Sequence, residues 1–177
     1  MVYIFTALKP EAQAFVDKYK LTKIKIDNYT LYINENIVLI ITHLGVYNCS
    51  KACKFIVQNY KIGDDDIFLN VGICGASKNY KIGNLIEIGT INFDKRSFTF
   101  KETAKTITCI DYEEKNNNYD LVDMESYGFY ESLQIYKNIF IFKVVSDHFE
   151  PQTITKEKTK MLIFNKLDEI LEKTCIT

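Results

Sequence analysis

The sequence has few of the side chains that most often bind anions and metals. Arg96 is the only arginine in 177 residues, so at most one guanidinium could clamp a phosphate or a carboxylate. Only two histidines occur, and none of the five cysteines forms a Cys-x-x-Cys pair. This composition argues against a metal site, and it favours free thiols over a disulfide or zinc framework.

The sequence also lacks a long apolar segment, a signal peptide and a strong net charge. No apolar run reaches the roughly 18 residues that are needed to span a membrane. The apolar run at residues 2–5 is short and is soon followed by charged residues, unlike the apolar core of a secretory signal. The formal net charge of −1 points to no nucleic acid or charged membrane as a partner. We therefore expect a cytoplasmic protein with no membrane or nucleic-acid partner.

Short apolar runs alternate with segments of helical periodicity along most of the chain. The expected strands cover residues 2–6, 29–33, 37–42, 67–71, 85–91, 106–110 and 138–145, and the expected helices cover residues 7–19, 48–60, the later part of 121–136, and 153–173. Several strands are apolar throughout, which is typical of strands buried on both faces. We expect one domain over residues 1–177, an α/β fold built as a three-layer α/β/α sandwich with a central mixed β-sheet.

Carboxylates follow three of the expected strands. They are Glu11 after the first strand, Glu125 after the extended start of residues 121–136, and Asp147 after the last strand. Taken alone, Asp147 is an ordinary turn residue, and the other two are ordinary acids at helix N-termini. Ligands in layered α/β folds bind at the carboxyl ends of strands, so three carboxylates at one edge suggest a chemical site.

The stretch VSDHFE, residues 145–150, closes the last apolar strand and contains three groups that can transfer a proton. Neighbouring residues of a strand point to opposite sides. We therefore expect His148 and Glu150 to be structural residues or to lie at the rim of the site, beside a functional Asp147.

Six segments carry a resemblance to a known family. They are TALKPEAQAF (residues 6–15), THLGVYNCSKA (42–52), NVGICGA (70–76), KIGNLIEI (81–88), LVDMESYGFY (121–130) and FKVVSDHFE (142–150). In this order they resemble the nucleoside phosphorylase superfamily, and within it they are most similar to the 5′-methylthioadenosine/S-adenosylhomocysteine nucleosidases. The more specific signal is a Met-Glu pair before a helix, followed about twenty residues later by Ser-Asp at a strand end.

The resemblance implies a role for each of the three carboxylates. Glu11 corresponds to the carboxylate that activates the attacking water, and Glu125 to the glutamate that binds the ribose hydroxyls. Asp147 corresponds to the aspartate that protonates N7 of the leaving purine. Cleavage of an N-glycosidic bond leaves negative charge on the base, so a general acid there is worth roughly 10²–10⁴-fold in rate.

Four further residues are implied in substrate binding. Met124 corresponds to a methionine that packs on the ribose, and Ser146 to the serine that assists the following aspartate. Gly72 and Ile73 fall in the glycine-containing segment NVGICGA, where the backbone could approach a sugar closely.

The function implied by the resemblance is that of a nucleosidase, a short and divergent member of its family. Such an enzyme hydrolyses a purine nucleoside or a 5′-modified adenosine to the free base and the ribose moiety, with no metal or organic cofactor. The implied partners are a small-molecule nucleoside and a second copy of the chain, because the family tends to complete its pocket as a homodimer. The implied setting is nucleoside metabolism, such as methionine salvage.

Two alternative functions stay open on the sequence. A purine nucleoside phosphorylase would use the same acid and ribose-binding groups, but residues 6–11 contain no glycine for a phosphate loop, and Glu11 would repel phosphate. A catalytically silent nucleoside-binding homologue is suggested by three departures from the family. Ile73 and Cys74 replace a small hydroxyl residue, Lys143 replaces an arginine, and the segment that precedes Met124 is shortened. We favour hydrolysis.

Overall fold

The computed structural model describes residues 1–112 and 119–174 and has a mixed α/β fold with a central sheet. Its strands are β1 (Val2–Thr6), β2 (Thr22–Ile26), β3 (Tyr29–Ile33), β4 (Ile37–Ile41), β5 (Ile67–Ala76), β6 (Leu85–Phe93), β7 (Arg96–Thr99), β8 (Lys105–Cys109), β9 (Leu121–Asp123) and β10 (Ile139–Asp147). Its helices are α1 (Lys9–Tyr19), α2 (Val46–Asn59), α3 (Ser126–Leu133), α4 (Lys156–Phe164) and α5 (Leu167–Lys173), with one 3₁₀ turn, η1 (Pro151–Thr153). None of these helices is long and apolar enough to cross a membrane.

Four parallel strands form the centre of the sheet, in the order β4, β1, β5 and β10. On one side, β3 and β2 continue the sheet antiparallel to β4. On the other side, the sheet runs from β10 through β6, β8 and β9, and β9 pairs with β5 again. The strands β5, β10, β6, β8 and β9 therefore close into a ring, so that half of the sheet is barrel-like.

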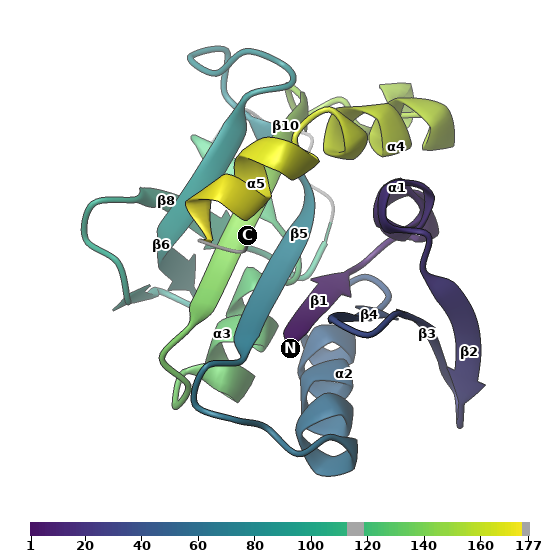
Figure 1. Cartoon of the computed structure of the whole chain (residues 1–177). Helices are drawn as coiled ribbons and strands as arrows, with labels where there is room; N and C mark the ends of the chain where they lie inside the picture. The colour runs from purple at the N-terminus through teal and green to yellow at the C-terminus, as the bar shows by residue number, and fades with distance from the viewer. Residues whose placement is uncertain (113–118, 175–177) are drawn as a thin grey trace.

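The alternation of side chains along the strands divides the core into two parts. In β1, Tyr3 and Phe5 pack in one hydrophobic cluster with residues of α2 and α3. Val2 and Ile4 pack in a second cluster with residues of α1, α4 and α5. This alternation is the period of two that a strand imposes, and Figure 1 shows α2 and α1 on different sides of the sheet.

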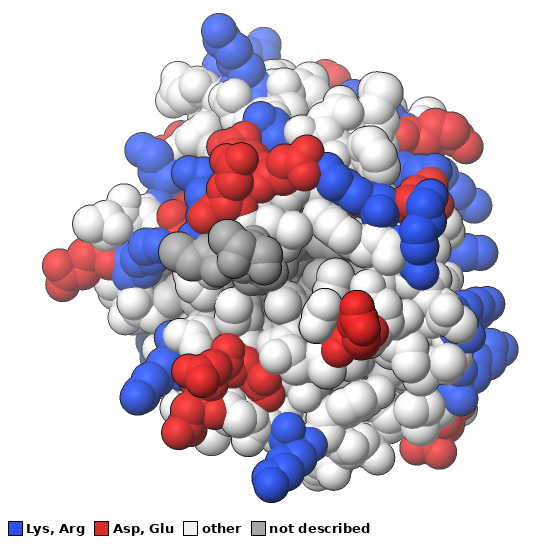
Figure 2. Space-filling model, in the orientation of Figure 1, with Lys and Arg blue, Asp and Glu red and all other residues white. Residues whose placement is uncertain are grey.

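The edge strand β2, which the sequence did not predict, packs Ile24 and Ile26 against the core and carries lysines on its exposed face. Lys23 and Lys25 are exposed on it, and Figure 2 shows basic side chains along the edge of the molecule where Figure 1 places β2. Lysines on an edge strand disfavour pairing with a further strand.

The strand β5 corrects one expectation, since it does not break at residues 72–75 but continues to Ala76. Its pairing with β10 extends from Phe68 to Gly75, and these ladder hydrogen bonds outweigh the low strand preference of glycine. A Cβ at Gly75 would lie 3.1 Å from Val122 Cγ1. The glycines of this strand mark close approaches and do not end it.

The C-terminal segment corrects a second expectation, since two helices replace the single helix predicted for residues 153–173. Helix α4 ends at Phe164, and α5 begins at Leu167. Helix α4 packs along α1, whereas Leu167 and Ile170 of α5 join the cluster that contains Phe142 of β10. The change of direction between α4 and α5 lets α4 cover α1 while α5 covers the cluster that contains Phe142 (Figure 1).

Candidate active site

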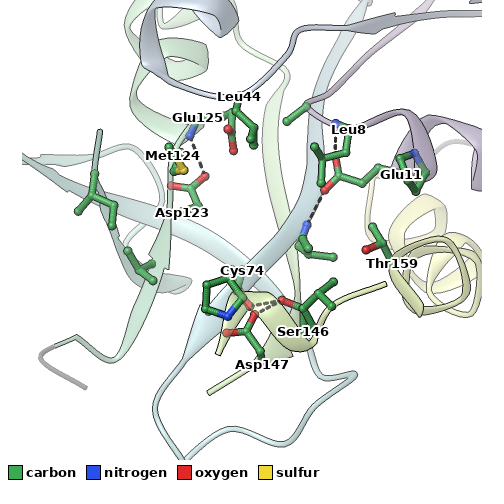
Figure 3. Close-up of a pocket in the computed structure, with 18 of the residues that line it drawn as sticks. Leu8, Glu11, Leu44, Cys74, Asp123, Met124, Glu125, Ser146, Asp147 and Thr159 are labelled. Atoms are coloured by element: carbon green, nitrogen blue, oxygen red, sulfur yellow. Dashed lines mark hydrogen bonds between the residues drawn. The ribbon is translucent and has the colours of Figure 1, made fainter. Parts of the chain in front are cut away.

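A cavity of about 340 Å³ lies at the carboxyl ends of β1, β5 and β10, where β9 also ends. Its wall includes all three carboxylates that the sequence singled out, Glu11, Glu125 and Asp147. Figure 3 shows them on three sides of one space, each from a different segment of the chain. A site at the carboxyl ends of parallel strands is the arrangement expected for this class of sheet.

Glu11 is fixed by two backbone N–H groups. It lies in the first turn of α1 behind Pro10, and its Oε2 accepts a hydrogen bond from Leu8 N at 2.9 Å. Its Oε1 accepts one from Ile73 N of β5, also at 2.9 Å. Burial raises the pKa of Glu11, although these N–H groups and the Lys143 ammonium oppose the shift. Glu11 is therefore a rigid carboxylate whose basicity is increased by its surroundings.

Glu125 stands at the N-cap position of α3 and is 5 % exposed. Its Oε1 accepts a hydrogen bond from Gly45 N at 3.0 Å, just before α2 begins. Burial raises the pKa of Glu125 to about 7. The ammonium of Lys143 opposes this shift, and the neighbouring carboxylate of Asp123 adds to it.

Asp123, which lines the cavity, forms a buried ion pair with Lys143. Lys143 lies in the middle of β10, only 1 % exposed, and its Nζ is 2.7 Å from Asp123 Oδ2. Asp123 also accepts hydrogen bonds from Ser126 N at 2.9 Å and from Ser126 Oγ at 2.7 Å. Asp123 thus ties the first turn of α3, and with it Glu125, to the centre of the sheet.

The carboxylates around Lys143 outnumber its single positive charge. Glu11, Asp123 and Glu125 surround the single ammonium of Lys143, so full ionisation would give −3 + 1 = −2. Burial disfavours the charged form of Lys143, but the three carboxylates outweigh it and raise the pKa of that ammonium. Burial is the main cause of the raised pKa of Glu125, and the neighbouring carboxylates of Asp123 and Glu11 add to it.

Asp147 and Ser146 stand at the end of β10, where the pairing register with β5 shifts by one residue. Ser146 Oγ lies 2.6 Å from Asp147 Oδ2 and 3.1 Å from Cys74 O. A hydroxyl has one proton, so Ser146 can donate to the Asp147 carboxylate or, with its proton on Cys74 O, accept from a protonated Asp147. Asp147 Oδ1 also accepts a hydrogen bond from Glu150 N at 2.9 Å. This network suits both protonation states of Asp147.

The wall beside Asp147 is apolar. Ile110, Val122 and Phe149 form a small buried cluster against which Met124 packs, and Val122 and Met124 both line the cavity. Phe149 has a positive φ of 64°, which turns the chain after β10 and brings this ring back toward the sheet. An apolar wall next to one carboxyl group is suited to a flat heterocycle with a proton acceptor at its edge.

The glycine-containing segment is only partly in the wall. Ile73 lines the cavity, and its N–H holds Glu11. Gly72 is not among the residues that line the cavity. A Cβ at Gly72 would lie 3.0 Å from Glu11 Oε1 and 3.6 Å from Lys143 Nζ. The glycine therefore makes room for these two side chains and does not reach the cavity itself.

His148 points away from the carboxylates. Its Nδ1 lies 3.0 Å from Ala76 O at the end of β5, and neither His148 nor Glu150 is among the residues that line the cavity. The proximity of His148 to Asp147 in the sequence therefore does not make a proton-transfer pair.

The sequence motifs assign no role to Asp123, to Lys143 or to the backbone of Gly45. For Lys143 a signal was present, because a charged residue within the apolar run IFIFKVV requires a buried partner. For Asp123 the signal was weaker, namely its position directly before Met124 and Glu125. No local pattern could assign Gly45, because its role depends on how α2 meets α3.

Sequence comparisons give no relatives, but structure comparisons do. No protein-family model matches the sequence, and a search of curated proteins finds no match. The structure is similar to the 5′-methylthioadenosine/S-adenosylhomocysteine nucleosidase of Campylobacter jejuni, with a TM-score of 0.81, 17% identity, and coverage of 99% of this chain and 98% of that one. It is also similar to the corresponding nucleosidase of Neisseria meningitidis, solved in complex with methylthio-immucillin-A, with a TM-score of 0.78, 14% identity, and coverage of 99% and 98%.

A third similar structure has a different named substrate. The futalosine hydrolase of Helicobacter pylori matches with a TM-score of 0.69 and 13% identity, covering 99% of this chain and 92% of that one. All three likenesses extend over nearly the whole of both chains. The resemblance seen in the motifs is thus confirmed in three dimensions, and the chain has the fold of the 5′-methylthioadenosine/S-adenosylhomocysteine nucleosidases.

Proposed function

We propose that this protein is a nucleosidase that hydrolyses the N-glycosidic bond of a purine nucleoside or a 5′-modified adenosine, giving the free base and the ribose moiety. The observation that carries the proposal is the convergence of Glu11, Glu125 and Asp147 on one cavity. Each has different surroundings, so each can take a different part in the reaction. The likeness to nucleosidase structures supports the same reaction.

In the proposed reaction Asp147 is the general acid. The base lies along the apolar wall of Ile110 and Val122, with its N7 toward Asp147, and Met124 packs on the ribose. As the glycosidic bond breaks, negative charge develops on the base, and a proton from Asp147 makes it a better leaving group. Ser146 then donates to the carboxylate that remains, at the 2.6 Å separation already present.

Glu125 and Glu11 act on the sugar side. Ionised Glu125 accepts hydrogen bonds from the ribose hydroxyls, and such charge-assisted bonds hold the sugar as its anomeric carbon becomes positive. Glu11 accepts a proton from the attacking water. Both backbone N–H groups that hold Glu11 bind the carboxylate in place, so that it needs little reorganisation during the reaction.

Water is favoured over phosphate as the nucleophile. A phosphate near Glu11 would meet a buried carboxylate, and the N–H groups of Leu8 and Ile73 already donate to that carboxylate. Lys143 is buried against Asp123. These groups support hydrolysis because they leave the Glu11 side of the cavity negative, which disfavours a second anion.

A panel of nucleosides tests the proposal. 5′-Methylthioadenosine, S-adenosylhomocysteine, adenosine and inosine are incubated with the protein, with and without phosphate, and the free base is measured. We expect base release that needs no phosphate and that falls by about 10²–10⁴-fold in Asp147→Asn, in line with the loss of a general acid. The matched control is Asp65→Asn, in an exposed turn before β5, whose opposite end lines the cavity. Release that depends on phosphate would instead indicate a phosphorylase, and no release from any nucleoside would favour a silent binding protein.

The proposal also covers the domain organisation, the cellular location and the pathway. We infer one domain over residues 1–177 with an α/β/α layering, supported by one connected sheet with helices packed on both faces. A cytoplasmic setting is supported by the free thiols of Cys49, Cys53, Cys74 and Cys109. Methionine salvage follows only if the substrate is 5′-methylthioadenosine.

A homodimer is supported by apolar side chains that are exposed near the cavity mouth. Leu44 and Tyr112 line the cavity and are 44% and 65% exposed, and Tyr47 is 67% exposed in the first turn of α2. Exposed apolar side chains that gather in one region often mark an interface. Sedimentation analysis would show twice the chain mass if the proposal is right, and a monomer would contradict it.

A further inference from the structure

Helices α2 and α3 meet through three contacts in register. The first is the hydrogen bond from Gly45 N to Glu125 Oε1, at 3.0 Å. The second brings the backbone of Val46 against Gly128. The third is the hydrogen bond between Ser50 Oγ and Ser132 Oγ, at 2.8 Å. On α3 these positions are 125, 128 and 132, which share one helix face at spacings of three and four.

The middle contact depends on the absence of a side chain. A Cβ placed on Gly128 would lie 2.2 Å from the carbonyl oxygen of Val46 and 3.0 Å from its carbonyl carbon. Both atoms belong to the backbone of α2, so they could give way only if the helix itself moved. Gly128 therefore sets how closely the start of α2 approaches α3.

The first contact depends on a second glycine. Gly45 has φ 98° and ψ 154°, a region of backbone space that is open essentially to glycine alone. Nothing lies within 4 Å of a Cβ built on Gly45, so its requirement comes from conformation and not from crowding. This conformation directs the Gly45 N–H toward Glu125, immediately before the helix that Gly128 places.

We propose that Gly128 is a positioning residue for the nucleosidase reaction, because it seats the start of α2 where the Gly45 N–H can hold the ribose-binding carboxylate of Glu125. The role of Gly128 in catalysis rests on the proposed function, whereas its role in placing Glu125 rests only on the contacts described above. Gly128 does not line the cavity.

A displaced Gly45 N–H changes the protonation of Glu125. The titratable groups that face Glu125 are Asp123 of β9, Lys143 of β10, Glu11 of α1, Cys49 of α2 and Cys109 of β8. The N–H of Gly45 favours the charged carboxylate, and so does Lys143, whereas Asp123 and Glu11 disfavour it. Without the Gly45 N–H, Glu125 stays protonated to a higher pH and binds the ribose hydroxyls more weakly at neutral pH.

The test compares Gly128→Ala with Ser132→Ala, which removes the far contact of the same helix pair without touching Glu125. The Glu125 carboxyl is followed by NMR on protein with carbon-13-labelled glutamate, assigned by its absence in Glu125→Gln. In Gly128→Ala we expect the titration midpoint to move to higher pH by about one unit, because a hydrogen bond to a charged group has been lost. In Ser132→Ala the midpoint should not move. An unchanged midpoint in Gly128→Ala, or an equal shift in both variants, would overturn the inference.

Kinetics and the wild-type protein complete the test. With 5′-methylthioadenosine, the acidic limb of kcat/KM should move by the same amount in Gly128→Ala, with about tenfold lower kcat/KM below pH 7. If Gly128→Ala does not fold, the Gly45 amide resonance of the wild type is followed instead. It should titrate with Glu125, and an amide that does not respond would contradict the inference. If the wild type releases no base, the proposed function fails, but the Glu125 titration in Gly128→Ala still decides whether Gly128 positions Glu125.

Discussion

At the residue scale, Glu125 shows how a buried carboxylate at the candidate site opposes stability. Its side chain is buried beside Asp123 and Glu11, and only Lys143 and one backbone N–H favour its charged form. The pKa of about 7 in the folded protein lies well above the usual 4.5 of a glutamate. Folding therefore favours the protonated side chain, whereas the proposed ribose binding needs the ionised one.

The stability of Glu125→Gln should reveal this conflict. A carboxyl whose folded pKa is raised contributes stability below its unfolded pKa and loses that contribution as pH rises through the folded value. Between pH 4.5 and about 7 the wild type should therefore lose stability that a neutral glutamine keeps. We expect the free energy of unfolding of Glu125→Gln, measured by urea denaturation, to exceed that of the wild type by on the order of 3 kcal/mol at pH 8. At pH 4.5 the two proteins should be equally stable. The exposed Glu35→Gln is the control, and a variant that is less stable than wild type at pH 8 would contradict this account.

Residues that line the cavity could be predicted where a motif contained them, and not where their place depends on contacts made only in the fold. Glu11, Glu125 and Asp147 were found from strand ends and from the family resemblance. Gly72 was expected at the substrate, but it serves Glu11 and Lys143 because those side chains cross the strand at that point. A glycine in a strand signals a close approach without indicating what approaches.

At the element scale, β5 and β10 form the support of the site. Lys143 of β10 pairs directly with Gly72 of β5, so the lysine side chain passes over a position without a Cβ to reach Asp123. The strand ends that follow, Ile73–Gly75 and Ser146–Asp147, line the cavity. The same pair of strands thus holds Lys143 of the buried ion pair and presents Asp147, the proposed general acid, at the cavity.

Removal of the Lys143 ammonium should strongly destabilise the fold. In Lys143→Met the carboxylates of Asp123 and Glu125 stay buried without their cation. Removal of one partner of a buried ion pair lowers the free energy of unfolding by about 3–5 kcal/mol. Urea denaturation at pH 7 measures the loss, with the exposed Lys105→Met as the control. The double variant Lys143→Met/Asp123→Asn should recover part of the stability. A loss of stability below about 1 kcal/mol in Lys143→Met would contradict the expectation that this ion pair is needed for the stability of the fold.

Helices and strands could be predicted where a local pattern of apolar residues determines them. The strands β1 and β10 are continuous apolar runs, and they were found within two residues of their observed ends. The break between α4 and α5 was missed because its cause is nonlocal. Ile163, Leu167 and Ile170 are at spacings compatible with one helix, and the need to cover α1 and then β10 decides the turn.

At the scale of the whole molecule, the fold brings together residues from both ends of the chain. Parallel pairing of β1, β5 and β10 places all their carboxyl ends at one edge, which is why Glu11 and Asp147 meet across one cavity. That convergence was predictable from the alternation of strands and helices. The ring from β5 through β10, β6, β8 and β9 was not, since β9 has three residues and pairs with strands that are distant in sequence.

The most direct test of the central claim separates the leaving base from the attacking water. A p-nitrophenyl riboside has a leaving group that departs without protonation, so its cleavage needs no general acid. We predict that Asp147→Asn keeps most of its activity on this substrate while it loses about 10²–10⁴-fold on 5′-methylthioadenosine, and that Glu11→Gln loses activity on both. Equal losses on the two substrates in Asp147→Asn, or full activity on the nucleoside, would contradict the assignment of Asp147 as the acid and Glu11 as the base.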